Sequence, residues 1–446
     1  MNKFVAFLEK YLSGPMAKLS EQQHIRAIRD GVVSALPFII FGSIFLIIAN
    51  PPIPENWAFY VWAKENIATI LIPYRLTMYI MTLYITFGIG YSLSQSYKID
   101  ALSGGLVSIA AFLFTIGVQS TEEFGFVLPM ANLGGHGLFV AMLVAVFSVE
   151  VLRLCKQKNI TIKMPEAVPS SVARSFEALI PIVIILGVMT VITVVFNLDL
   201  HSMVDKVVAP IIKGGDTIFG VTIPVFLITF FWAFGIHGMS VVGAVIRPVW
   251  EVYLAKNGEA AASGMPLPYV APETFFQWFV WIGGAGATLG LVIAMFISAR
   301  SKYSKSMAKA TFIPSIFNIN EPVIFGMPIV LNPILIIPFI IVPLVTTVIT
   351  YICVTVGLVS ATYVMAPWTL PAPIGAYLAT GGDWRAIILV LVNIAISTII
   401  YLPFFKIYDR QLVAQEQLEE ESLKEVVEET TETAPIKPST DGNAPS

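Results

Sequence analysis

Long apolar segments follow one another through most of this chain and limit how it can fold. A helix that crosses a membrane needs about 20 mostly apolar residues, and such stretches recur along the sequence from about residue 30 to residue 405. Charged residues amount to only 12% of the chain, whereas soluble domains contain about 25%. The sequence therefore predicts an all-α integral membrane protein with about ten transmembrane helices. The candidate spans lie near residues 30–49, 68–93, 101–118, 135–152, 175–196, 219–236, 239–256, 276–298, 333–359 and 384–405.

The basic residues indicate the direction of these crossings. If the N-terminus lies in the cytoplasm, 19 of the 26 Lys and Arg fall in the cytoplasmic segments that ten crossings create. The expected outer loop, residues 119–134, has no Lys or Arg and contains Glu122 and Glu123. Because basic residues accumulate on the cytoplasmic side, we expect a multi-pass protein with both termini in the cytoplasm.

The two halves of the chain differ in regularity. Residues 1–199 read as regular helices, about five spans, and are expected to form an N-terminal scaffold domain. Residues 200–410 contain apolar stretches that Pro, Gly and polar residues interrupt, most clearly at 311–332 and 366–373. Irregular backbone at membrane depth persists only where it is buried in protein or lines a wet cavity. We therefore expect the second half to hold the binding site and to contain re-entrant hairpins.

Three further segments are too polar or too short to cross a membrane. Residues 4–12 and 200–213 combine apolar and charged residues at helical spacing, which is typical of amphipathic helices in the membrane interface. Residues 411–446 are rich in Glu and close with Ser, Thr and Pro, a composition that predicts a disordered cytoplasmic tail. This tail either contacts soluble partners or is a solvated end without function.

An ionisable group stands in the interrupted stretch FNINEPVIFGMP, residues 317–328. Glu321 lies there between two asparagines and a proline, and Pro314 and Pro328 bracket the segment as in a hairpin. A carboxylate in lipid is costly, so such groups face the protein interior and usually mark a substrate or ion pathway. Glu321 and Asn320 are therefore candidate binding residues. The alternative is a capped carboxylate in an interfacial loop.

A histidine and two tryptophans indicate what such a site could bind. His237 and Trp232 lie in FWAFGIHGMS, where glycines let the backbone approach a ligand closely, and Trp368 lies in the irregular APWTLPAP. Sugars have apolar faces that stack on rings and hydroxyls that need directed hydrogen bonds. A cavity with these rings, Asn, His and Glu would suit a sugar. The alternatives are a packing histidine and tryptophans of the interfacial belt.

The sequence gives little indication of metal binding, cofactor binding or thiol chemistry. The four histidines form no chelating pair, so no metal site is expected, and without a nucleotide-binding motif no cofactor is indicated. Cys155 and Cys353 stand in or beside apolar runs and are expected to be packing residues. The roles of His136 and Arg75 stay open between ligand binding and, respectively, a helix start and an interfacial arginine.

The motif NINEP followed by VIFGMP, with GIHG upstream, resembles the membrane (IIC) component of the bacterial sugar phosphotransferase system. The similarity lies within the lactose/cellobiose branch, close to the transporters of N,N'-diacetylchitobiose and cellobiose, and extends from about residue 5 to residue 410. It implies a homodimer in the bacterial cell membrane, joined through the N-terminal spans. It also implies that the second half, 200–410, is a transport domain that carries the sugar in an elevator movement.

The same resemblance implies how the sugar is modified. A soluble partner, the IIB component, passes a phosphoryl group from its cysteine to the sugar 6-hydroxyl, and the IIA component is a further implied partner. Glu321 and His237 match family residues that bind the sugar near that hydroxyl, and they are our candidate catalytic residues. Asn320, Trp232 and Trp368 match positions that line the same pocket. The chain itself has no phosphoryl-carrying residue, because neither cysteine stands in a suitable loop.

An ion-coupled sugar symporter with Glu321 as the coupling site is the alternative that the residues leave open. Proton-coupled carriers use the same residue types, so Glu321 and His237 alone do not separate the two classes. The sequence also leaves open which disaccharide is carried, which face is open, and whether Glu321 acts as a base or only binds.

Overall fold

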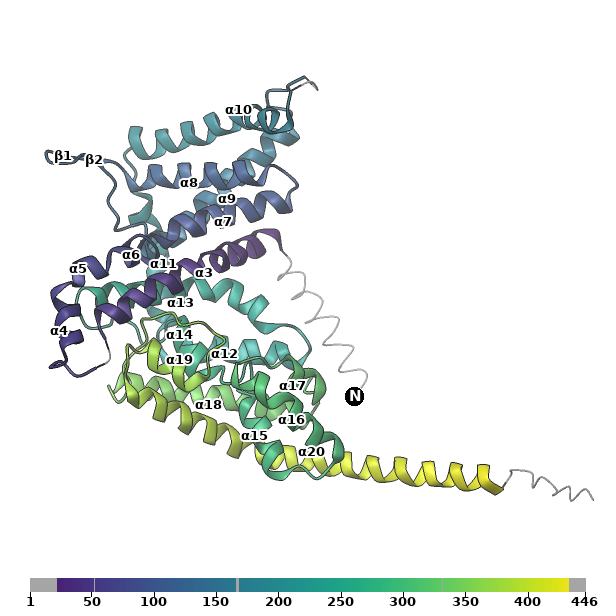
Figure 1. Cartoon of the computed structure of the whole chain (residues 1–446). Helices are drawn as coiled ribbons and strands as arrows, with labels where there is room; N and C mark the ends of the chain where they lie inside the picture. Colours follow the sequence, from purple (N-terminus) through teal and green to yellow (C-terminus); the bar gives the residue numbers. More distant parts are fainter. Residues whose placement is uncertain (1–21, 52, 166–167, 331, 433–446) are drawn as a thin grey trace, which may run out of the picture.

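The computed structural model describes residues 22–51, 53–165, 168–330 and 332–432, and its regular structure is almost entirely helical (Figure 1). The prediction of an all-α protein is confirmed, apart from a small hairpin in the expected outer loop. There β1 (Gln119–Thr121) pairs antiparallel with β2 (Gly125–Val127). The interfacial helix expected at residues 4–12 lies outside the described residues.

Helices of the first half approach one another closely because small residues line their contacts. A Cβ at Gly31 would overlap Ile89, and a Cβ at Gly104 would overlap Ser94. These contacts join α3 to α7 and α7 to α8, which lie in successive layers in Figure 1. The elements of this half are α3 (Gln23–Ala49), α4 (Ala58–Glu65), α5 (Ile67–Ile70), α6 (Ile72–Arg75), η2 (Met78–Ile80), α7 (Met81–Ser96), α8 (Ala101–Ile116), η3 (Gly135–Gly137), α9 (Leu138–Gln157), α10 (Ser170–Thr190) and the π-helical turn η4 (Val191–Val195).

The second half is built from shorter and broken helices. The expected amphipathic segment 200–213 falls in α11 (Leu200–Gly215), which meets the apolar α12 (Ile218–Ala233) at 81°. The expected hairpin around Glu321 is also present, because α16 (Lys302–Ile316) runs into a turn at 317–320 and α17 (Glu321–Gly326) returns along it. The Tyr303 hydroxyl donates to the Gly326 carbonyl at 2.6 Å and closes the open end. The remaining elements are α13 (Gly238–Ala262), α14 (Glu273–Phe275), the π-helical turn η5 (Phe276–Val280), α15 (Leu289–Ser298), α16 (Lys302–Ile316), α17 (Glu321–Gly326), α18 (Ile336–Thr355), α19 (Ala372–Ala379) and α20 (Trp384–Glu432).

Fewer helices than the ten expected are long and apolar enough to cross a membrane. Among the described residues, five helices are long and apolar enough to cross a membrane, or up to seven if each bent pair counts as one span. The count of ten stays a prediction, since α8 and α15 are apolar but shorter than a full span. The expected span 276–298 is wrong as a continuous helix. An irregular loop, residues 281–288, separates η5 from α15.

The tail also differs from the prediction. The composition predicts disorder from residue 411, but α20 continues as one helix to Glu432 (Figure 1, yellow). The Glu416 carboxylate accepts hydrogen bonds from the backbone N–H groups of Lys302, at 3.0 Å, and Tyr303, at 2.9 Å. Glu420 pairs with the Lys302 ammonium and raises the pKa of Lys302. Strong helix formers and these contacts to the start of α16 explain the ordered helix, while residues 433–446 lie outside the described part.

Candidate functional site

Residues from four segments of the second half line one open cavity of about 150 Å³. All five residues predicted from the sequence as ligand contacts belong to it: Trp232, His237, Asn320, Glu321 and Trp368. Their role in binding stays a prediction, but the structure does bring them together. The other lining residues are Ile228, Met239, Gln277, Trp281, Gly284, Ala285 and Asn318.

His237 caps the start of α13 and is held in one orientation by that contact. Its Nδ1 accepts a hydrogen bond from the Ser240 backbone N–H at 3.2 Å and lies 3.0 Å from the Ser240 hydroxyl oxygen. Because Nδ1 is an acceptor here, the neutral imidazole carries its proton on Nε2. The side chain is exposed, and its ring lies 4.5 Å from the Trp232 ring, centroid to centroid. His237 can therefore offer a fixed N–H donor to a ligand hydroxyl.

The two asparagines of the NINEP motif have different surroundings. Asn318 is 8% exposed, and both ends of its side-chain amide form hydrogen bonds. Its Oδ1 accepts from the Gly283 N–H at 2.9 Å, while its Nδ2 donates to the carbonyls of Trp368, at 2.9 Å, and Leu370, at 3.0 Å. Asn320 uses its Nδ2 to bind the Ala285 carbonyl at 2.7 Å. Asn318 therefore fixes the cavity walls, and Asn320 keeps its amide oxygen for another donor.

Glu321 is exposed and begins the short helix α17. Within the described part of the chain, its carboxylate makes no hydrogen bond or ion pair. A negative charge is favoured at a helix start, where backbone N–H groups point outward. Glu321 is close enough to His237 for the two side chains to interact electrostatically. The cavity thus contains both a strong acceptor and a fixed donor, which is the combination that a hydroxyl group requires.

The two predicted tryptophans differ in exposure. Trp232 is 6% exposed and packs in the main apolar core, so it is not a belt residue facing lipid. Trp368 is 52% exposed, and the hydrogen bond from Asn318 to its carbonyl anchors its backbone. Trp232 can form a wall of the cavity, while Trp368 leaves much of its ring free to cover a ligand.

Sequence reasoning missed the part of the site that comes from η5 and the following loop. The cavity lining includes Gln277, Trp281 and Gly284. The sequence predicts instead a regular transmembrane helix over residues 276–298. Three glycines of the WIGGAGATL segment have positive φ, and a Cβ at Gly284 would overlap the Asn320 side chain. The glycine cluster was the available signal, because glycines at this density mark turns and close backbone approach.

A buried ion cluster fixes α13 against this second part of the site. The Arg247 guanidinium of α13 contacts the Glu273 carboxylate of α14 at 3.0 Å and the Glu251 carboxylate at 3.6 Å. Glu251 is fully buried. Removing one member of such a cluster is strongly destabilising, because it leaves a buried charge uncompensated. The cluster therefore holds α14, and the adjoining η5 with Gln277, in place beside the helix that His237 caps.

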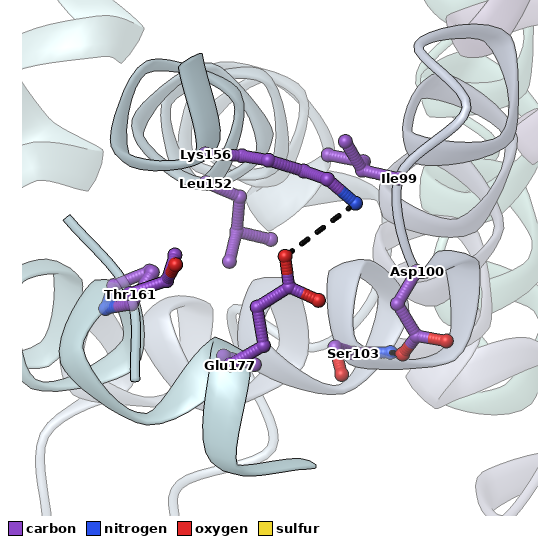
Figure 2. Close-up of a pocket in the computed structure, with 9 residues that line it drawn as sticks. Ile99, Asp100, Ser103, Leu152, Lys156, Thr161 and Glu177 are labelled. Atoms are coloured by element: carbon purple, nitrogen blue, oxygen red, sulfur yellow. Dashed lines mark hydrogen bonds and ion pairs between the residues drawn. The ribbon is translucent and has the colours of Figure 1, made fainter. Parts of the chain in front are cut away.

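A separate hollow in the first half is too small for a sugar. Figure 2 shows it between α8, α9 and α10, where the Lys156 ammonium lies 3.7 Å from the Glu177 carboxylate. Its volume is about 30 Å³, which is comparable with the space for one water molecule. Arg75 and His136 are exposed at the end of α6 and in η3, and neither belongs to the lining of the 150 Å³ cavity.

Comparison with known proteins places the chain in a family. Residues 29–343 match the family described as "Phosphotransferase system, EIIC". The chain is 41% identical to the PTS system cellobiose-specific EIIC component of Geobacillus stearothermophilus over 94% of its own length and 97% of that protein. It is 40% identical to the lichenan permease IIC component of Bacillus subtilis (strain 168), over 93% and 96% of the two chains.

A solved structure gives the same result. The fold matches that of the transporter ChbC, the IIC component from the N,N'-diacetylchitobiose-specific phosphotransferase system, with a TM-score of 0.85 and 40% identity. The match covers 92% of this chain and 99% of that one. The chain therefore belongs to the EIIC family of the phosphotransferase system, and it is a membrane protein of that system.

Proposed function

We propose that this protein is the sugar permease of a phosphoenolpyruvate-dependent phosphotransferase system and carries a β-linked disaccharide of the cellobiose or diacetylchitobiose type. One observation carries the proposal: Glu321, His237, Asn320, Trp232 and Trp368 line the same cavity in a chain of the EIIC family. The cavity combines a carboxylate acceptor, an imidazole donor and indole faces. This combination suits a ring with hydroxyl groups, and relatives named for cellobiose and diacetylchitobiose support the substrate class.

The geometry of the site suggests separate roles for its two titratable groups. His237 carries its proton on Nε2, so it would donate to the sugar 6-oxygen. Glu321 would accept the 6-hydroxyl proton. The 6-oxygen then attacks the phosphorus of the phosphocysteine on the IIB partner, an O–P bond forms, the S–P bond breaks, and the partner's cysteine leaves as a thiolate. Charge-assisted hydrogen bonds are roughly twice as strong as neutral ones, which explains why a carboxylate is kept at this position.

The movement of the site between the two membrane faces is proposed to occur between the two halves of the chain. Residues 1–199 would form the scaffold through which two copies associate, and residues 200–410 would move with the sugar as an elevator. Contacts such as the hydrogen bond from the Met365 backbone N–H to Ser43 Oγ, at 3.0 Å, would break during that movement. Both termini would lie in the cytoplasm, where IIB and IIA act.

The test separates this function from ion-coupled symport. Membrane vesicles that contain the protein are supplied with the soluble partners and phosphoenolpyruvate, and the accumulated product is identified. Sugar phosphate is expected. Accumulation of free sugar, driven by a pH gradient without phosphoenolpyruvate, would overturn the proposal.

Glu321→Gln, which keeps shape but removes charge and basicity, separates binding from catalysis. If Glu321 accepts the proton, phosphorylation of bound sugar should fall far more than affinity does. A variant that binds and phosphorylates sugar like the parent would show that Glu321 is only a structural carboxylate of the hairpin. Glu122→Gln, which removes the same charge from an exposed position between β1 and β2, is the matched control.

A further inference from the structure

A concavity of about 450 Å³ lies where α15 ends beside α20, and it shares no lining residue with the sugar cavity. Figure 1 shows the two helices side by side. Three exposed basic side chains line this space, Arg300 after the end of α15 and Lys406 and Arg410 on α20. Lys406 and Arg410 are four residues apart and therefore share one face of the helix. We call this space the basic concavity.

The positive charge of the basic concavity is not compensated within the described part of the chain. Asp409 is the acidic residue in its lining, and it is 2% exposed. Its carboxylate accepts from the backbone N–H of Arg300 at 2.7 Å and from the Ser301 hydroxyl at 2.9 Å. It therefore holds the segment that leads into α16, whose N-cap is Ser301. None of the three basic side chains forms an ion pair with another described residue, so the concavity presents a cluster of cations to an external group.

Exposed apolar side chains lie next to the cations of the basic concavity, as expected for a site at the edge of a membrane. Ile297, which is part of its lining, is 66% exposed, and its neighbour Phe296 is 50% exposed. Ile407, between the two cations of α20, is 50% exposed. Large apolar side chains in contact with solvent are unfavourable, but they are expected where they face acyl chains. Apolar residues thus give way to basic ones at the end of α15 and along α20. This change is typical of the boundary between lipid acyl chains and headgroups.

We propose that the basic concavity binds the phosphate-bearing headgroup of an anionic phospholipid from the cytoplasmic leaflet. Arg300, Lys406 and Arg410 would contact the phosphate, and the acyl chains would lie along Ile297 and Phe296. Basic spaces between membrane helices on the cytoplasmic side are suited to such headgroups. An acidic surface of a soluble protein would suit the cations equally well, but it would not explain the exposed apolar residues beside them.

The test compares lipid binding by two variants of the full-length protein in detergent. One is Arg300→Gln/Lys406→Gln/Arg410→Gln, and the control is Lys213→Gln/Lys305→Gln/Lys309→Gln, which removes the same charge from exposed positions elsewhere. Thermal stability and lipid retained in native mass spectrometry are measured with phosphatidylglycerol and with phosphatidylcholine. One basic residue near a membrane surface changes affinity about fivefold, so the first variant should bind phosphatidylglycerol on the order of 100-fold more weakly, while the control should bind like the parent.

Three results would overturn the proposal. Equal weakening in both triple variants would show that only overall charge matters. An equal stabilisation by inorganic phosphate would assign the site to a free anion rather than a lipid. Unchanged lipid binding with lost phosphorylation by the soluble partners would assign the surface to protein docking. Sugar affinity shows whether each variant is folded. If the triple variant misfolds, the single variant Lys406→Gln should still weaken phosphatidylglycerol binding about fivefold.

Discussion

Asn318 is the residue whose replacement the structure allows us to predict in most detail. Its amide makes three hydrogen bonds, at 2.9, 2.9 and 3.0 Å, and its backbone has a φ of +61°. A buried hydrogen bond contributes about 1 kcal/mol, so Asn318→Ala loses about 3 kcal/mol from these contacts. A left-handed backbone costs a non-glycine residue without a short polar side chain roughly 1 kcal/mol more. The expected total is about 4 kcal/mol.

Two comparison variants divide this loss into its parts. Asn318→Gly loses the same hydrogen bonds but adopts the positive φ without strain, so it should be about 1 kcal/mol more stable than Asn318→Ala. Asn320→Ala loses one hydrogen bond, from Nδ2 to the Ala285 carbonyl, and should cost about 1 kcal/mol. Unfolding in mixed micelles gives the stabilities, and a binding titration gives the sugar affinities. If Asn318→Ala were no less stable than Asn320→Ala, the assignment of Asn318 as the central structural link would be wrong.

Three further predictions concern stacking, movement and the tail. Trp232→Ala and Trp368→Ala should each weaken disaccharide binding by about 1–3 kcal/mol if the rings stack on the sugar, while Trp57→Ala, at an exposed position of the first half, should leave a binding titration unchanged. Ser43→Cys combined with Met365→Cys should, after oxidation, abolish transport but leave binding; full transport by the oxidised protein would contradict movement between the halves. Glu416→Ala removes the acceptor for the Lys302 and Tyr303 N–H groups and should destabilise the start of α16 by about 1 kcal/mol; unchanged hydrogen exchange at those two amides would show that the contact does not form.

The sequence predicted the residues of the site better than the backbone that carries them. Glu321 and His237 stand out because removing a polar group from water into an apolar surrounding is costly, and the sequence alone shows that such a group stands there. The loop at residues 281–288 was missed because its flanking residues are as apolar as those of a true span. Periodicity does not reveal a break that tertiary hydrogen bonds from Asn318 and Asn320 stabilise. The helical tail was missed for a similar reason, since its contacts with α16 join residues more than a hundred positions apart.

The hydrogen bonds of the two asparagines divide the cavity into two walls. One wall contains the loop 281–288, the turn with Glu321, and Trp368, all joined through Asn318 and Asn320. The other contains Trp232 and His237 at the junction of α12 and α13. Among the described residues, no side-chain hydrogen bond joins a cavity-lining residue of one wall directly to one of the other, and the Arg247–Glu273 contact links α13 to α14 behind them. The strong acceptor belongs to the first wall and the fixed donor to the second, so a sugar hydroxyl that donates to Glu321 and accepts from His237 would bridge them. Binding would then hold the two walls together as well as orient the oxygen, because both effects depend on the same pair of hydrogen bonds.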